Sequence, residues 1–333
     1  MESAFLLVEW LGTPAWMWLG FLGLVVALLA FDLGVLHREN HEIGVSESLR
    51  LSALYIALGL GFGGLVWWHL GAESGMNYLT GFVVEKTLAM DNVFVIAMIF
   101  SFFAVPRIYQ HRVLFWGILG VIVLRAIMIG FGAALVTSFS WVLYLFAAFL
   151  VATGVKMLLS DGAEKPLDQN PLLRLMKRRL NVTETHHGER FFVRLPHPVT
   201  GRPALFVTPL FLALVMVEVA DVIFAVDSVP AIFAITTDPF IVYTSNIFAI
   251  LGLRALYFAL AAMIHRFEYL KVALAAVLIF IGSKIFLADM LGLAKIPPAI
   301  SLGVTFGILV AGVAYSLWKT RPGGARLAEE AGR

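Results

Sequence analysis

Six carboxylates lie inside hydrophobic stretches that are long enough to cross a bilayer: Asp32, Glu85, Asp91, Glu218, Asp221 and Asp227. An ionised carboxylate in hydrocarbon costs several kcal/mol, so it is tolerated only beside a partner, a bound ion or water. The chain must therefore fold so that these charges face one another or a polar cavity rather than lipid.

The composition agrees with a membrane protein. Sixty per cent of the residues are hydrophobic and only 14% are charged, whereas a soluble domain carries roughly 25% charged residues. The net charge of +2 gives no indication of a nucleic-acid partner, and none is expected. The chain has no cysteine, which excludes disulfides, thiolate metal sites and thiol catalysis. No cleavable signal peptide is evident, so the first apolar run is expected to be a retained helix.

Windows of about 20 apolar residues predict an all-α polytopic membrane protein. Nine transmembrane helices are expected, near residues 15–36, 50–70, 78–103, 112–137, 140–159, 205–235, 241–264, 270–290 and 298–318. They divide the chain into a first membrane half (1–159), a basic loop (160–204), a second membrane half (205–318) and a tail (319–333).

The basic residues predict the orientation. Eighteen Lys and Arg residues fall in the loops after the odd-numbered spans and in the tail, whereas the other side of the membrane has only Lys295. The positive-inside rule then places the N-terminus outside and the C-terminus in the cytoplasm.

The loop 160–204 is the only sizeable soluble segment. Its sequence NPLLRLMKRRL predicts a basic amphipathic helix that could lie on anionic headgroups. The following RFFVRLPHPVTGRPALFV predicts a short hairpin. The loop could be a plain linker or could dock a protein partner, and its three histidines (His186, His187 and His197) are expected to be solvated rather than metal-bound.

Two acidic motifs repeat along the chain, Glu85-x5-Asp91-Asn92-Val93 and Asp221-x5-Asp227-Ser228-Val229. Each is followed in the next span by an arginine before an alanine, Arg125-Ala126 and Arg254-Ala255. Alternating topology puts the motifs on antiparallel helices. This predicts an inverted repeat with a midplane site, and chance similarity of two acidic helices is the alternative.

The oxygen groups of the motifs suit a hard divalent cation such as Mn²⁺, Mg²⁺ or Ca²⁺. Residues seven apart share a helix face, and Pro230 frees a backbone carbonyl nearby. We expect Asp91 and Asp227 to be the central ligands. Five residues should complete or support the shell: Glu85, Asn92, Glu218, Asp221 and Ser228.

Buried salt bridges are the alternative role for these acids, with Arg125, Arg254, Lys86 and Lys284 as partners. Six acids exceed what these four bases need, so at least two acids should hold a proton or a metal. Asp32 lies near the cytoplasmic end of the first span, where it could be a helix cap, a partner of Arg38 or a gate on the ion route.

The sequence resembles the TerC family, in particular its Alx-like branch. The matching stretches are FDLGVLHR at 31–38, GFVVEKTLAMDNVFV at 81–95 and the long run from Thr208 to Phe258. The resemblance implies an integral inner-membrane protein of the wider LysE-like transporter group, associated with manganese export and, in other members, with tellurium resistance.

Two functions follow as hypotheses. The first is a secondary exporter of divalent cations, most of all Mn²⁺, in exchange for protons; the metal is then a substrate, and no cofactor is expected. The second is a membrane assembly, scaffold or metal-stress resistance protein that acts through partners bound at 160–204. An enzyme is not expected, because no His-Glu-x-x-His or serine-based constellation occurs in a span.

Overall fold

Apolar helices make up nearly all of the protein in the computed structural model, which describes residues 8–34, 44–159, 167–196, 201–261, 269–291 and 296–320. The helices are α2 (Ala15–Gly34), α3 (Val45–Phe102), α4 (Arg107–Ser138), α5 (Val142–Leu159), α6 (Pro171–Arg179), α7 (Pro209–Ile235), α8 (Pro239–Leu251), α9 (Leu253–Ala261), α10 (Leu270–Met290) and α11 (Pro298–Lys319). Strands β1 (Glu9–Trp10) and β2 (Thr13–Pro14) pair at the N-terminus. The expected all-α polytopic fold is confirmed.

Helix α3 is a hairpin of two arms. A straight helix of its 58 residues would be about 87 Å long, roughly three times the hydrocarbon core. Gly71 interrupts it with φ 87° and ψ 173°, a conformation that glycine adopts without steric cost. The Tyr78 hydroxyl donates to the carbonyl of Gly59 at 2.9 Å, although a straight helix would hold these residues about 28 Å apart. We call residues 45–70 the first arm and residues 72–102 the second arm.

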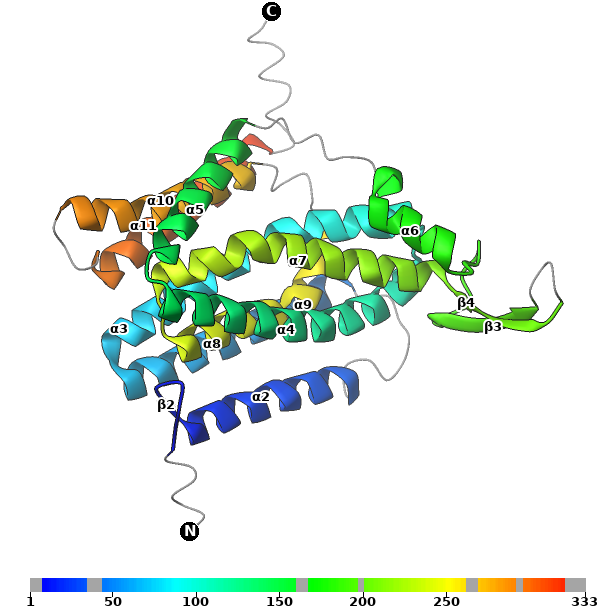
Figure 1. The fold of residues 1–333 in the computed structure, drawn as a ribbon, viewed down its shortest axis with the longest axis horizontal. Coiled ribbons are helices and arrows are strands. Elements are labelled where there is room, and N and C mark those ends of the chain that lie inside the picture. The colour runs from blue at the N-terminus through cyan, green and yellow to red at the C-terminus, as the bar shows by residue number, and fades with distance from the viewer. Residues whose placement is uncertain are drawn as a thin grey trace, which may run out of the picture.

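The second arm of α3 packs against α7, and α7 packs against α4, in the middle of the bundle (Figure 1). Helix α2 lies on one flank (blue in Figure 1), where Trp18 and Phe21 contact Phe240 of α8. Helices α5, α10 and α11 lie together on another flank. Close contact between α5 and α10 is possible because Gly154 and Gly282 have no side chain: a Cβ on either would lie 2.8 or 2.6 Å from a carbonyl oxygen of the facing helix.

The second span of the C-terminal half is broken. Helix α8 ends at Leu251, Gly252 follows, and α9 begins at Leu253 with its axis bent by 51°. The sequence predicted one continuous helix over 241–264, so the break is a difference from that expectation. Its physical basis is Gly252, because glycine is about 1 kcal/mol less favourable than alanine in a helix interior.

Length and apolar composition identify six candidate spans within the described residues, or seven if α8 and α9 form one span. That count treats α3 as a single helix and leaves out α2, whose apolar stretch Ala15–Phe31 is shorter than the others. The predicted number of nine spans is therefore not confirmed. The two arms of α3 nevertheless occupy the ranges in which two separate spans were expected.

A small element of one α-helix and two strands follows α5. Asn170 caps α6 by accepting from the backbone N–H groups of Leu172 and Leu173. Strands β3 (Phe192–Pro196) and β4 (Pro203–Val207) form an antiparallel hairpin that projects from one end of the bundle (Figure 1). The Arg112 guanidinium of α4 holds this element to the bundle through Glu189 at 2.6 Å. His197, Lys165 and the tail beyond residue 320 lie outside the described residues.

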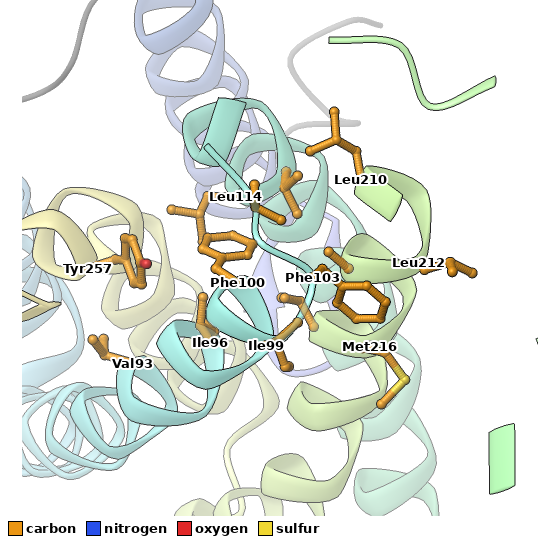
Figure 2. Close-up of a cluster of buried hydrophobic side chains, with 14 of the residues drawn as sticks. Val93, Ile96, Ile99, Phe100, Phe103, Leu114, Leu210, Leu212, Met216 and Tyr257 are labelled. Carbon is orange, nitrogen blue, oxygen red and sulfur yellow. The ribbon is translucent and has the colours of Figure 1, made fainter. Parts of the chain in front are cut away.

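A buried apolar layer fills this end of the bundle. Figure 2 shows side chains of the second arm of α3, of α7 and of α9 gathered there, among them Phe100, Met216 and Tyr257. The Phe100 and Tyr257 rings meet edge to face with centroids 5.5 Å apart. A second apolar layer, which includes Val84, Val229 and Ile232, lies further along the same helices. The acidic motifs lie between the two layers.

Candidate ion site in the bundle core

The two acidic motifs meet on antiparallel helices. Near one end, Gly81 of the second α3 arm lies against Ile232 of α7. Towards the other end, Ile99 shares an apolar cluster with Leu212. Residue numbers therefore rise along one helix while they fall along the other. Glu85 lies near the middle of the second α3 arm, and Asp221 and Arg125 lie near the middle of α7 and α4.

Arg125 of α4 joins the two motifs. Its side chain is only 1% exposed. Its Nη1 contacts Glu85 Oε1, and its Nη2 and Nε donate to the two carboxylate oxygens of Asp221 at 3.0 and 3.2 Å. Ser228 Oγ lies 2.8 Å from Nη1, and Asn246 Oδ1 lies 3.4 Å from it. One guanidinium thus pairs with one acid from each motif.

The charges in this cluster do not cancel. With both acids ionised, Glu85 and Asp221 carry two negative charges and Arg125 carries one positive charge. A buried excess charge is costly unless a proton, a cation or water compensates it. The cluster is therefore suited to take up one more positive charge.

Asp227, Asn92 and Ser228 border a cavity of about 170 Å³. Arg125 also lines this cavity, as do Met157 near the end of α5 and Lys271 at the start of α10. Asp227 Oδ1 accepts a hydrogen bond from Thr153 of α5 at 3.3 Å. The cavity places a carboxylate, an amide and a hydroxyl next to the Arg125 cluster, and these oxygen groups suit a hard cation.

A larger cavity of about 340 Å³ is lined by other residues of α3, α5, α7 and α10, nearer the opposite ends of these helices. Its polar lining includes Glu73, Asn77, Thr236, Lys284 and Asp289. The α7 and α10 residues between the two cavities are apolar and buried, namely Val229, Ile232 and Ile281. An apolar layer thus separates the two cavities.

Glu218 lies apart from the cavity at Asp227. It packs against Gly120 of α4, where a Cβ would collide with the carboxylate. Its Oε2 is buried and has no hydrogen-bond partner among the described residues. Glu218 therefore lies on the α4 side of α7, while Asp227 faces α5.

The side chains of Asp91, Arg254 and Asp32 lie outside the described part of the structure. The ligand role of Asp91, the repeat-related role of Arg254 and the gating role of Asp32 stay predictions. Among the side chains that are described, no group of three His, Asp or Glu residues is placed to hold a metal ion.

Three polar residues at the site were not predicted from the sequence: Asn246, Thr153 and Lys271. Asn246 closes the run Thr244-Ser245-Asn246 within an otherwise apolar helix, and that run was a usable signal. Thr153 gave no signal, because a lone threonine in a transmembrane helix commonly bonds to its own backbone.

Comparison with known proteins identifies the family of this chain. Residues 70–323 match the family described as "Integral membrane protein TerC family". The chain belongs to this family, as its sequence indicated.

The relatives are similar over nearly their whole length. A protein of Salmonella typhi named "Putative membrane-bound redox modulator Alx" is 48% identical over 316 residues, which cover 92% of this chain and 95% of the relative. The Shigella flexneri protein of the same name is 47% identical over 316 residues, covering 92% and 96%. An uncharacterized membrane protein of Myxococcus xanthus is 48% identical over 310 residues, covering 93% and 94%. No solved structure matches the chain.

Proposed function

We propose that this chain is a secondary transporter that exports divalent metal cations, with Mn²⁺ as the expected substrate, in exchange for protons. The observation that carries the proposal is the sharing of one buried guanidinium, Arg125, by Glu85 and Asp221. The excess carboxylate can be neutralised either by a cation or by a proton. Those two alternatives are the loaded and empty states that an exchanger needs.

The cavity beside Asp227 supports a route to this cluster. Met157 and Lys271 lie at the helix ends next to the loops that the basic residues assign to the cytoplasm. A cation from that side would meet the oxygens of Asp227, Asn92 and Ser228 first. Release would follow on the opposite side, through the cavity lined by Glu73 and Asp289.

We further propose nine membrane spans, an outside N-terminus and an inner-membrane location. Six helices have the length and composition of a membrane span. The further spans come from counting the two arms of α3 separately, from the bent pair α8–α9 and from the short helix α2. The 18 basic residues on the predicted cytoplasmic side support the orientation. The antiparallel acidic helices support an inverted repeat.

The name of the Alx relatives suggests a redox role. In this chain such a role could not use thiol–disulfide exchange, because there is no cysteine. A scaffold role would rest on the hairpin β3–β4, which exposes Phe192 and Leu205 beyond the bundle. Under either alternative, the charged cluster in the bundle core would be a purely structural set of ion pairs.

Cellular manganese content tests the proposal. Cells that express the wild-type chain under manganese load should hold less manganese than cells with an empty vector. Asp227→Asn should abolish the difference at equal expression, whereas Glu184→Gln, in an exposed acid outside the bundle, should preserve it. Equal manganese in the wild-type and empty-vector cells would refute export and favour a scaffold role.

A further inference from the structure

A buried lysine meets the broken span at its break. The bend at Gly252 ends α8, and the last carbonyls of a helix lack the intrahelical amide partners that a continuing helix would supply. Lys86 Nζ donates to one of them, the carbonyl oxygen of Ala249, at 3.0 Å. A Cβ on Gly252 would lie 2.7 Å from the same Nζ. The ammonium thus fits directly against the backbone at the bend.

Burial makes this contact unusual. Lys86 is 9% exposed and comes from the second arm of α3, a different helix from the one it contacts. Burying an ammonium costs several kcal/mol unless a partner compensates it. The negative end of the α8 dipole and the Ala249 carbonyl provide that compensation. Among the described side chains, no carboxylate forms an ion pair with Lys86.

Broken helices in transporters commonly use the carbonyls of a half-helix C-terminus to coordinate a monovalent cation. Lys86 Nζ is in the position of such a cation. We infer that the Lys86 ammonium is a built-in replacement for an alkali ion, and that it holds the α8–α9 break together by occupying a monovalent-cation site. Lys86 is a positioning residue in this account, because its contact is with the backbone at the bend.

The Lys86 contact is linked to the charged cluster around Arg125. Lys86 is the sequence neighbour of Glu85, so one turn of the second arm contacts both the α8–α9 break and Arg125. Asn246, one turn before Ala249 on α8, also lies beside Arg125. A change in the α8–α9 bend would therefore move the surroundings of the charged cluster. The inference is independent of which ion is exported.

Cation rescue of purified protein tests the site. Lys86→Ala leaves room for a small cation against the Ala249 carbonyl, whereas Lys86→Met removes the charge and keeps most of the volume. We expect both variants to lose about 5 °C or more in Tm. In Lys86→Ala, methylammonium or potassium should restore at least half of the lost Tm. The reference is the Tm in a bulky organic cation at equal ionic strength. Lys86→Met and the wild type should not respond.

Equal responses of Lys86→Ala and Lys86→Met to these cations would overturn the inference. Recovery of folded Lys86→Ala only when methylammonium is present during solubilisation would count as rescue. Failure to recover folded protein both with and without methylammonium would count against the site. As a second measurement, Gly252→Ala should lower Tm more in the wild type than in Lys86→Met, because its Cβ displaces the ammonium. Equal losses would contradict the inference. None of these readouts uses manganese, so their failure would leave the export proposal standing.

Discussion

Arg125 and Asp221 form a two-pronged ion pair in which Nη2 and Nε of the guanidinium each donate to one carboxylate oxygen, at 3.0 and 3.2 Å. This side-on geometry uses two of the five N–H donors and leaves Nη1 for Glu85 and Ser228. The pair therefore fixes α4 to α7 and, through the remaining donors, to the second arm of α3. A lysine at this position could not replace it, since it lacks the planar fork.

Arg125→Ala should destabilise the protein by about 3–5 kcal/mol, because two buried acids would lose their common partner. The loss of folded protein can be measured by thermal unfolding in detergent. Removing the acids as well should recover much of the loss: the triple variant Arg125→Leu, Glu85→Gln, Asp221→Asn should unfold at a higher temperature than Arg125→Ala. A triple variant that is no more stable would show that the cluster is not held by charge.

Asp227→Asn should fold like the wild type and lose metal binding. The substitution keeps the volume and a hydrogen-bonding oxygen for Thr153 but removes the charge that faces the cavity. Asp91→Asn is expected to behave in the same way, from its place in the motif. Isothermal titration of purified protein with Mn²⁺ measures the effect, with Glu184→Gln as the control. If both Asn variants bind Mn²⁺ with wild-type affinity, these acids have a structural role and are not ligands.

Gly120→Ala should cost about 1–3 kcal/mol, because its Cβ would collide with the Glu218 carboxylate. Gly117 is a matched control one turn earlier on α4, where a Cβ would make only ordinary contact, 3.6 Å from Val217. Gly117→Ala should therefore be nearly neutral. Combining Gly120→Ala with Glu218→Ala should relieve most of the cost. Equal effects at the two glycines would mean that Glu218 does not occupy this space.

Single cysteines introduced into this cysteine-free chain can test the topology without background labelling. Glu184→Cys in the loop after α6 and Thr237→Cys between α7 and α8 should react from opposite sides of the membrane. A membrane-impermeant maleimide added to intact cells should label only the second variant. Labelling of both from outside, or of Glu184→Cys alone, would contradict the predicted orientation.

The sequence was most informative where the pattern is local. The transmembrane helices, the amphipathic helix Pro171–Arg179 and the paired strands Phe192–Pro196 and Pro203–Val207 each follow from patterns of neighbouring residues. Such patterns indicate an element without tertiary information. Arg125 was also identifiable, since a basic residue in a span needs an acidic partner.

The remaining features depend on tertiary packing. Nothing in the motif spacing indicates that Glu85 and Asp221 share one arginine while Glu218 packs against a glycine of α4. The break at Gly252 was missed because a single glycine within a long hydrophobic window does not by itself indicate the end of a helix. The contact of Lys86 with Ala249 joins residues 163 positions apart, which no local pattern reveals.

Manganese flux into proteoliposomes under a controlled pH gradient tests the central claim most directly. An acidic lumen should speed Mn²⁺ uptake by the wild type, and Mn²⁺ added outside should raise the lumenal pH as protons leave. Collapsing the pH gradient while the membrane potential is clamped should slow uptake, and Asp227→Asn should show neither flux. Mn²⁺ uptake that does not depend on the pH gradient would contradict proton exchange. Mn²⁺ flux through Asp227→Asn equal to that of the wild type would place the ion site elsewhere.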